Sequence, residues 1–477
     1  MSIRRRTRIA AAAVAVALAG GLAAVPAAGA ATPGASAVSA LKADPTAEGD
    51  GQKKSFSVTG GATTRDGGDA RQARGVSPRN PYRARTGVLI NDPLGNNQRR
   101  QVLNQQTIDI IKSTPGGQKI RLSEWNIDSS WFVRNALAAH RRGVSFQILM
   151  SGGVASRQNP ETGSFYRLRR GFAGSGNNKR KAGMRSWIRG CNASCRGRTG
   201  INHAKFMTVT KTGRRANARN IVSVSSANIT SAAGSNQWND TFTVVGRPKV
   251  FNFFGRLFTE MAPDKVRKNP YKTQKPASPT WIKAMWANPA QGRDRVLNLL
   301  DKVKCRGATG GTGINGRTAV RIAQTVFSDE RGRAIARKLK ALQGNGCKVK
   351  VVYTLMDREI REMLGSGGAT RVPTRQLVRD TNGDGYYDKY LHTKITTISG
   401  HFGNKRNAHI VRTGSENWTQ MSKQSDEVGF DMDNAGYERR YSNFVDNVFN
   451  KASASYTPQD PNARRLGIDP YKYVEIN

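Results

Sequence analysis

Hydrophobic positions follow two patterns along the chain, one typical of buried strands and one typical of amphipathic helices. In the first half, the pattern predicts a strand over Lys119 to Ile127, a helix over Trp131 to Arg142 and a strand over Val144 to Met150. Gly143 stands directly before the second strand, where a glycine commonly ends a helix. Strands that alternate with helices predict an α/β fold in layers.

The same succession of elements returns in the second half. It predicts a strand over Thr318 to Phe327, a helix over Glu330 to Leu342 and a strand from Cys347, with Gly346 as the helix stop. We therefore expect two homologous halves packed as one unit, each a mixed, largely parallel sheet flanked by helices. The expected boundaries are 84–262 for the first half, 263–280 for a Pro- and Lys-rich linker, 281–456 for the second half and 457–477 for a tail.

The N-terminal part of the chain has a different pattern. Four arginines within the first eight residues precede an Ala-rich apolar core from Ile9 to Val25, and Ala28 to Ala30 form a small-residue cleavage site. Residues 1–30 are predicted to be a signal peptide, and the mature protein is expected to be secreted and extracellular. Residues 31–83 are rich in Ala, Gly, Ser, Thr and Arg without apolar periodicity, which predicts a disordered leader.

Four cysteines fit an exported protein, because disulfides persist in oxidising compartments. Sequence alone allows three pairings. Cys191 and Cys195 lie close together in a Gly- and Arg-rich loop, which leaves Cys305 and Cys347 as a long-range pair. A zinc site is the alternative, but no histidine lies at ligand spacing from the local pair. Two structural disulfides are favoured.

Charge adds a second expectation. The chain carries 77 Lys and Arg against 33 Asp and Glu, a formal net charge of +44. Between Thr162 and Asn239 there are fifteen basic residues and no acidic one. A charge run is usually a solvated face, but this one surrounds a candidate site. A positive field there would concentrate an anionic partner.

That candidate site is a polar motif that occurs twice. Each copy has a His-x-Lys pair, followed 23 residues after the histidine by a Ser-x-Asn segment, and the two copies are offset by 189 residues throughout. The residues are His203, Lys205, Ser226 and Asn228 in the first copy and His392, Lys394, Ser415 and Asn417 in the second. A single His-x-Lys pair is weak evidence of a site, but four polar residue types that recur in register indicate a duplicated active-site motif.

With these residues, the chain resembles the phospholipase D superfamily of phosphodiesterases, whose members have two His-x-Lys motifs, each followed by a Gly/Ser-Ser-x-Asn segment. The resemblance runs from about Thr86 to Asn450. It implies a phosphodiesterase with its active site at the interface of the two halves and without a cofactor. In one respect the chain departs from the family, which usually has an Asp five residues after the Lys. Thr210 and Ser399 occupy those places.

Cleavage of a phosphodiester needs positive charge near the non-bridging oxygens, a nucleophile and an acid for the leaving group. The two lysines and two asparagines supply cationic and amide donors. One imidazole can be neutral while the other is protonated, because the ordinary pKa is about 6.5. The resemblance implies that one histidine forms a phosphohistidine while the other protonates the leaving alcohol and then activates water. We assign His203 as the nucleophile and His392 as the acid and base.

Acidic residues downstream of the motifs are candidates to orient the imidazoles. They are Asp240 in the first half and Asp426 or Glu427 in the second. An ordinary ion pair on a basic protein explains them equally well.

A further acidic stretch, just before His392, has the spacing of a calcium loop. Its oxygen-bearing residues are Asp380, Asn382, Asp384 and Asp388. Leu391 stands at the twelfth position, where a calcium-binding EF-hand has a glutamate. A turn-rich acidic loop is an equal alternative, and no catalytic metal is expected.

Three functions fit these features. The first is a secreted phospholipase D that hydrolyses phospholipid head groups, acting as a monomer in peripheral contact with a membrane surface. The second is a secreted, metal-independent nuclease, favoured by the basic tract. The third is an inactive anion-binding protein, disfavoured because both motif sets are retained. Export and the resemblance favour anionic or zwitterionic phospholipid over nucleic acid as the partner.

Overall fold

The computed structural model describes residues 75–174, 176–215, 218–289, 292, 294–454 and 467–475. The predicted signal peptide and residues 31–74 of the predicted leader lie outside the described residues. The rest of that leader belongs to the fold. Tyr82 is half-buried against the first core, and its backbone N–H donates a hydrogen bond to Ser113 Oγ at 2.8 Å.

A seven-stranded mixed sheet forms the first half, with the strand order β1-β10-β7-β6-β2-β4-β5. Its strands are β1 Gly87–Ile90, β2 Lys119–Glu124, β4 Ser145–Ser151, β5 Trp187–Cys191, β6 Phe206–Thr212, β7 Ala218–Ser225 and β10 Asp240–Val244. The predicted strands of the first half are present as β2 and β4, which lie side by side.

The second half contains a nine-stranded mixed sheet with the order β11-β12-β20-β19-β18-β13-β14-β15-β21. Its strands are β11 Lys272–Gln274, β12 Ile282–Ala287, β13 Ala319–Phe327, β14 Lys348–Met356, β15 Thr374–Gln376, β18 Lys394–Phe402, β19 Lys405–Gly414, β20 Val428–Asp433 and β21 Ser453–Ala454. From β12 to β15 the order repeats that of the first sheet, in agreement with the duplicated motif. β11 lies within the predicted linker and extends this sheet.

Most neighbouring strands run antiparallel, so the prediction of largely parallel sheets is wrong. Parallel pairing is confined to β2, β4 and β5 in the first sheet and to β13, β14 and β15 in the second. The pairs β6/β7 and β18/β19 are antiparallel because each follows directly along the chain through a short turn. A run of hydrophobic residues indicates that a strand is buried but not whether its neighbours run parallel to it. For this reason the hydrophobic pattern did not predict the antiparallel pairs.

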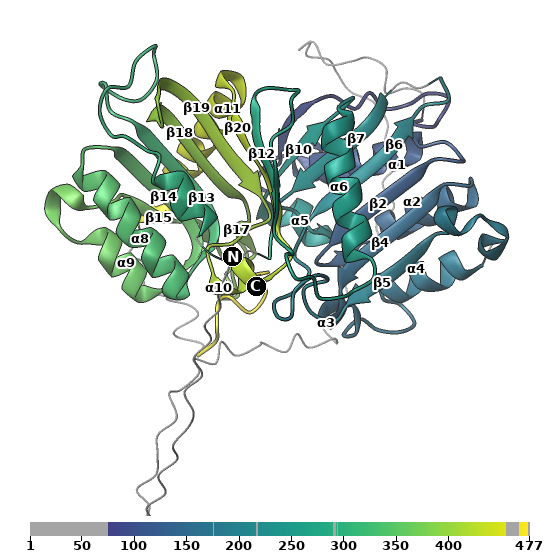
Figure 1. Ribbon diagram of the computed structural model, residues 1–477. Coiled ribbons are helices and arrows are strands. Elements are labelled where there is room, and N and C mark those ends of the chain that lie inside the picture. The colour runs from purple at the N-terminus through teal and green to yellow at the C-terminus, as the bar shows by residue number, and fades with distance from the viewer. Residues whose placement is uncertain are drawn as a thin grey trace, which may run out of the picture. The chain divides into compact units, whose positions relative to one another are not determined.

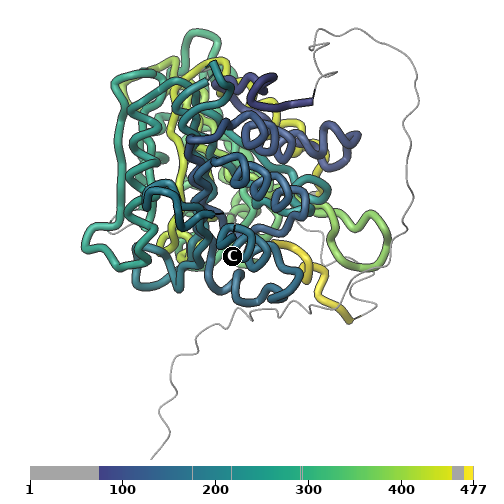
Figure 2. The backbone as a smooth tube through the Cα atoms, turned by 90° about the vertical axis from the view of Figure 1, so that its right-hand side faces the viewer, coloured from purple at the N-terminus to yellow at the C-terminus, as the bar shows by residue number. Residues whose placement is uncertain are grey.

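Helices cover both faces of the sheets. They are α1 Asn97–Ser113, α2 Ser130–Arg141, α3 Gly152–Ala155, α4 Ser164–Ala173, α5 Ser231–Ser235, α6 Pro248–Met261, α7 Arg295–Leu300, α8 Asp329–Gly344, α9 Arg358–Gly365, α10 Gln420–Gln424 and α11 Ala435–Lys451. In Figure 2, α1, α2 and α4 lie on one face of the first sheet and α6 on the other. Gly143 and Gly346 follow α2 and α8 with φ angles of 93° and 92°, which confirms both predicted helix stops.

One hydrophobic cluster contains buried residues of both halves, and each half also has a cluster of its own. Figure 1 shows α6 and α11 on the sheets of the first and second halves, and buried residues of both helices belong to the same cluster. Phe242 of β10 and Phe254 of α6 contact Phe430 of β20, with ring centroids 5.7 and 5.5 Å apart. A small sheet also joins the halves, because β9 Gln237–Trp238 pairs in parallel with β17 Lys389–Leu391. β17 also pairs with β16 Val378–Arg379, and a two-stranded sheet pairs β3 Ile127–Asp128 with β8 Ile229–Thr230.

Both predicted disulfides are present. One joins Cys191 to Cys195 directly after β5, and the other joins Cys305 to Cys347, 42 residues apart. The second bridge ties the segment before β13 to the start of β14. Within the described residues, every helix is too short or too polar to cross a membrane.

Candidate active site

The two His-x-Lys pairs lie where β6 and β18 begin. The backbone N–H of His203 donates to the carbonyl of Asp426 at 3.0 Å, and that of His392 donates to the carbonyl of Trp238 at 2.9 Å. Each motif is therefore held by the backbone of the opposite half, so both contribute to one site. All eight predicted catalytic side chains are buried, and the most exposed of them, Lys394, is only 4% exposed.

The imidazoles have different partners at equivalent positions. His203 Nδ1 lies 2.8 Å from Glu427 Oε1, and His392 Nδ1 lies 3.0 Å from Asn239 Oδ1. Glu427 directly precedes β20 and Asn239 directly precedes β10. Because these strands are equivalent in the two sheets, the first ring is oriented by a carboxylate and the second by an amide.

Serines of the two motifs hold these orienting residues. Ser226 Oγ donates to Asn239 Oδ1 at 2.8 Å, and Ser415 Oγ donates to Glu427 Oε2 at 2.5 Å. The Asn239 amide nitrogen donates to the Ala233 carbonyl and to Gln237 Oε1. This directs Asn239 Oδ1 towards His392, so that ring carries a proton on Nδ1 and leaves Nε2 for chemistry.

Asp240 and Asp426, which the sequence also suggested as orienting residues, have other partners. Asp240 accepts hydrogen bonds from Thr413 Oγ1 at 2.6 Å and from the Tyr441 hydroxyl at 2.9 Å. Asp426 is bonded to Arg196 Nε and to Ser194 Oγ, each at 2.9 Å. Neither carboxylate is bonded to a histidine, because the residues next to them in sequence, Asn239 and Glu427, point at the rings instead. Asp426 anchors the loop of the Cys191–Cys195 disulfide to the second half.

Burial and positive charge shift the protonation of the site. Burial lowers the pKa of both His203 and His392 well below its ordinary value, and the two lysines lower it further. Burial also lowers the pKa of Lys205 to about 8, although Glu427 and Glu124 oppose the shift. The pKa of Lys394 is lowered well below its ordinary value by burial and by the charge of Lys205. A bound anion would relieve this excess of positive charge.

The side chains of the two motif asparagines are buried and have different surroundings. Asn228 Nδ2 donates to Glu475 Oε2 at 2.6 Å. Both polar side-chain atoms of Asn417 are buried without a hydrogen-bond partner among the described residues. A buried unpaired amide is costly, so a ligand that accepts its hydrogen bond would be stabilised. The loop of Asn417 is fixed by buried Arg331, which donates to the Asn417 carbonyl and to Glu416 Oε1.

The sequence patterns did not predict several residues of the site, among them Asn239, Glu124 and Glu475. Glu124 ends β2, one position beyond the Ser123–Phe206 pair, and therefore lies opposite Lys205. Burial raises its pKa well above the ordinary value, while the charge of Lys205 opposes the rise. In the second half, Gln324 pairs with Lys394 in the corresponding register. The register of the two sheets identifies Glu124 and Gln324, and it is known only once the strands are paired.

The candidate calcium loop is closed by its own hydrogen bonds. Asp380 accepts from the backbone N–H groups of Gly383 and Gly385 at 2.7 and 2.8 Å, and Asp388 accepts from the Thr381 N–H at 3.0 Å. Across the part of the chain that the structure describes, no three His, Cys, Asp or Glu side chains gather as metal ligands. The loop has the hydrogen bonding of an acidic turn.

No family model matches the chain, and no curated protein matches it. Among solved structures, the phosphatidylserine synthase of Haemophilus influenzae Rd KW20 is similar over 80% of this chain and 92% of that chain. The two share 12% identical residues, and the TM-score is 0.50. At that identity, the likeness shows that the two proteins share a fold.

Two other structures are similar to a smaller degree. The polyphosphate kinase of Porphyromonas gingivalis has 12% identity and a TM-score of 0.48, covering 80% of this chain and 54% of the kinase. This chain thus spans about half the length of the kinase. Nuc of Salmonella typhimurium, a phospholipase D family member, has 18% identity and a TM-score of 0.26, covering 38% of this chain and 96% of Nuc. At these TM-scores, neither likeness carries an argument.

Proposed function

We propose that this chain, which has the fold of the phospholipase D superfamily, is a secreted phosphodiesterase that hydrolyses phospholipid head groups through a phosphohistidine. One observation carries the proposal. Two His-x-Lys pairs from duplicated halves meet in one buried site, and the Nδ1 atom of each imidazole contacts a partner from the other half. An inactive anion-binding protein would have no need for both rings to be oriented in this way.

In the first step, His203 Nε2 attacks phosphorus and the bond from phosphorus to the head-group oxygen breaks. His392 Nε2–H donates its proton to that oxygen, so the alcohol leaves neutral. In the second step, neutral His392 takes a proton from water while the water oxygen attacks phosphorus. The bond from phosphorus to nitrogen breaks, His203 is restored and the proton stays on His392. Lys205, Lys394 and the Asn417 amide stabilise the non-bridging oxygens.

The partners of the two rings support this division of roles. Formation of the phosphohistidine places positive charge on the His203 ring, and the Glu427 carboxylate at 2.8 Å stabilises it. His392 faces the neutral Asn239 amide, which does not hold a positive charge in the same way. His392 is therefore the better proton donor. The negative charge of a bound phosphodiester would favour its protonated form.

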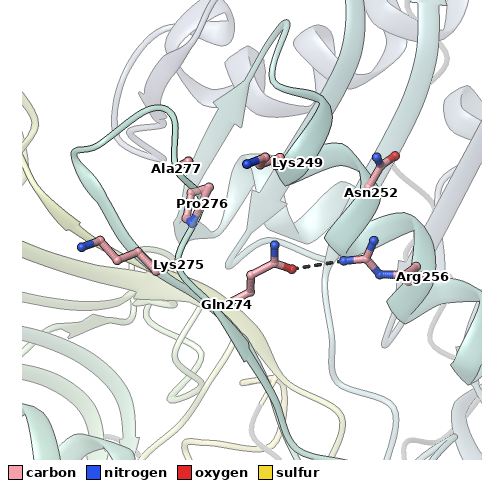
Figure 3. A pocket seen from close by; sticks show the side chains of 7 residues that line it. All are labelled: Lys249, Asn252, Arg256, Gln274, Lys275, Pro276 and Ala277. Atoms are coloured by element: carbon pink, nitrogen blue, oxygen red, sulfur yellow. Dashed lines mark hydrogen bonds between the residues drawn. The ribbon is translucent and has the colours of Figure 1, made fainter.

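A nuclease is the second candidate, favoured by a basic surface cavity of about 360 Å³. Figure 3 shows that Lys249, Asn252 and Arg256 of α6 line it. The opposite wall contains Gln274 of β11 and Lys275. Three cationic side chains and no carboxylate line this cavity, which is suited to a phosphate group outside the catalytic site. The tract of fifteen basic residues supports the same candidate.

The experiment compares substrates directly. Purified mature protein is assayed on mixed phospholipid vesicles, on plasmid DNA and on RNA. His203→Ala serves as the inactive variant. His401→Ala replaces a histidine outside the site, bonded to the Arg306 carbonyl, and serves as the matched control. Head-group release that vanishes only in His203→Ala supports the lipid substrate. Nucleic-acid cleavage without lipid turnover contradicts it.

A primary alcohol provides a check on the intermediate. If the phosphohistidine forms, ethanol should compete with water for it and lipid turnover should yield phosphatidylethanol. Turnover without that product would contradict the covalent step.

A further inference from the structure

The described segment Gly467–Glu475, near the end of the chain, docks on a cluster of aromatic residues beside the catalytic site. Pro470 accepts a hydrogen bond from the Tyr387 backbone at 2.8 Å, and the ring of Tyr471 lies 5.0 Å from that of Tyr387. Val474 is buried with Tyr387 and Tyr390. In Figure 1 this segment is drawn in yellow near β17, the strand that leads directly to His392.

Docking carries Glu475 into the catalytic site. Its backbone N–H donates to the Tyr390 hydroxyl at 3.0 Å. Its carboxylate accepts hydrogen bonds from Asn228 at 2.6 Å and from Gln237 at 3.0 Å. The negative charge acts on both Lys205 and Lys394.

The carboxylate thus uses the groups expected to receive a phosphodiester. It accepts a hydrogen bond from the amide of one motif, and its charge acts on the two lysines, as the charge of non-bridging phosphate oxygens would. Two anions cannot share those contacts, because like charges at close range repel. With the segment docked, the reactive side chains are buried, and none of the eight motif side chains is more than 4% exposed.

We propose that the segment Gly467–Glu475 is an intramolecular inhibitor whose Glu475 carboxylate occupies the phosphate site. The identification of that site rests on the proposed function. Substrate gains access when the segment leaves the tyrosine cluster. The observed affinity for an anion is then the intrinsic affinity multiplied by the fraction of molecules with the segment released.

The test uses the full-length protein and two ways of displacing the segment. Glu475→Ala removes the carboxylate. Val474→Asp places a charge in the aromatic cluster and so weakens docking while Glu475 remains. Glu362→Ala is the matched control, because it removes one negative charge from the exposed surface of α9. Phospholipid turnover is measured for each, together with the Kd for inorganic phosphate by calorimetry, which needs no catalysis.

Glu475→Ala and Val474→Asp should each raise kcat/KM by about ten- to a hundredfold, mainly through KM, for a released state populated at about 1–10%. The Kd for phosphate should fall by a similar factor, and Glu362→Ala should change neither value. An unchanged phosphate Kd, or a loss of turnover in Glu475→Ala, overturns the inhibitor and leaves the proposed function standing. Tighter phosphate binding without turnover in any variant supports the inhibitor and overturns the proposed function.

Discussion

The site consists of two half-sites, one around His203 and Lys205 and the other around His392 and Lys394. Their backbones are equivalent, but the side chains next to the histidine and the lysine differ in charge. In the first half-site, both neighbouring side chains are carboxylates: Glu427 is hydrogen-bonded to the His203 ring, and Glu124 lies opposite Lys205. In the second half-site, the equivalent side chains are amides: Asn239 is hydrogen-bonded to the His392 ring, and Gln324 lies opposite Lys394. Duplication produced one scaffold twice, and the two copies differ in charge at both positions.

This difference supports the unequal tasks that we propose for the two motifs. Carboxylates stabilise positive charge, so the first half-site suits the histidine that carries phosphorus. Amides orient a ring without fixing its charge, so the second half-site suits a histidine that gives and takes a proton in each turnover. The following predictions test this assignment, from the largest expected effect to the smallest.

Removal of either imidazole should have the largest effect. His203→Ala and His392→Ala should each lower kcat by at least about a thousandfold, and the double variant should lose little more, because the two residues act as a unit. With a labelled diester that has a good leaving group, His392→Ala should accumulate a covalent phosphoenzyme and His203→Ala should form none. Label on the His203→Ala protein would reverse the assignment of the nucleophile.

Exchange of the orienting partners should break the asymmetry. Glu427→Gln makes both partners amides and should lower kcat by about a hundredfold or more, since the positive ring loses its carboxylate. Asn239→Asp makes both partners carboxylates and should raise the pKa of His392. The pH profile of kcat should then shift to higher pH. An unchanged profile in Asn239→Asp would contradict a proton-transfer role for His392.

The lysines should determine the alkaline limit of activity. Burial lowers the pKa of Lys205 to about 8, with the charge of Glu475 opposing the shift, so Lys205 is a cation below that pH and loses its charge as the pH rises through it. We expect kcat/KM to fall above about pH 8, since the cation is needed to bind the phosphodiester. Lys205→Arg should make this fall less steep, because the guanidinium stays charged while Lys394, whose pKa is also lowered by burial, still titrates. Lys205→Ala should cost about a hundredfold at neutral pH.

Chelation should have the smallest effect. The positive charge of the site comes from lysine and histidine, and the acidic loop is closed by hydrogen bonds between Asp380 and the backbone of Gly383 and Gly385. Activity should survive EDTA, and Asp380→Asn should resemble the unmodified protein. Complete loss of activity with EDTA, restored by calcium, would instead make this loop a required site.

Local patterns in the sequence predicted much of the molecule. The α/β class, both helix stops and both disulfides are confirmed, and the eight motif residues are all buried. Their catalytic roles stay predictions. The direction of most strands was wrong, because hydrophobic periodicity records which face is buried and carries no information on pairing.

The sequence by itself determined which polar residues each half contributes to the site. The position of each motif within its half depends only on the local strand and the adjoining loop. The tertiary structure decided which residues touch. Glu427 lies 224 residues from His203 along the chain, and Asn239 lies 153 residues from His392. The pairing of strands between the halves places these two residues, and not their neighbours Asp426 and Asp240, in contact with the rings. Burial then set the pKa values, and the fold placed Glu475 among the catalytic groups, 247 residues from Asn228. Such contacts arise from the packing of distant segments, and the spacing of residues along the sequence does not predict them.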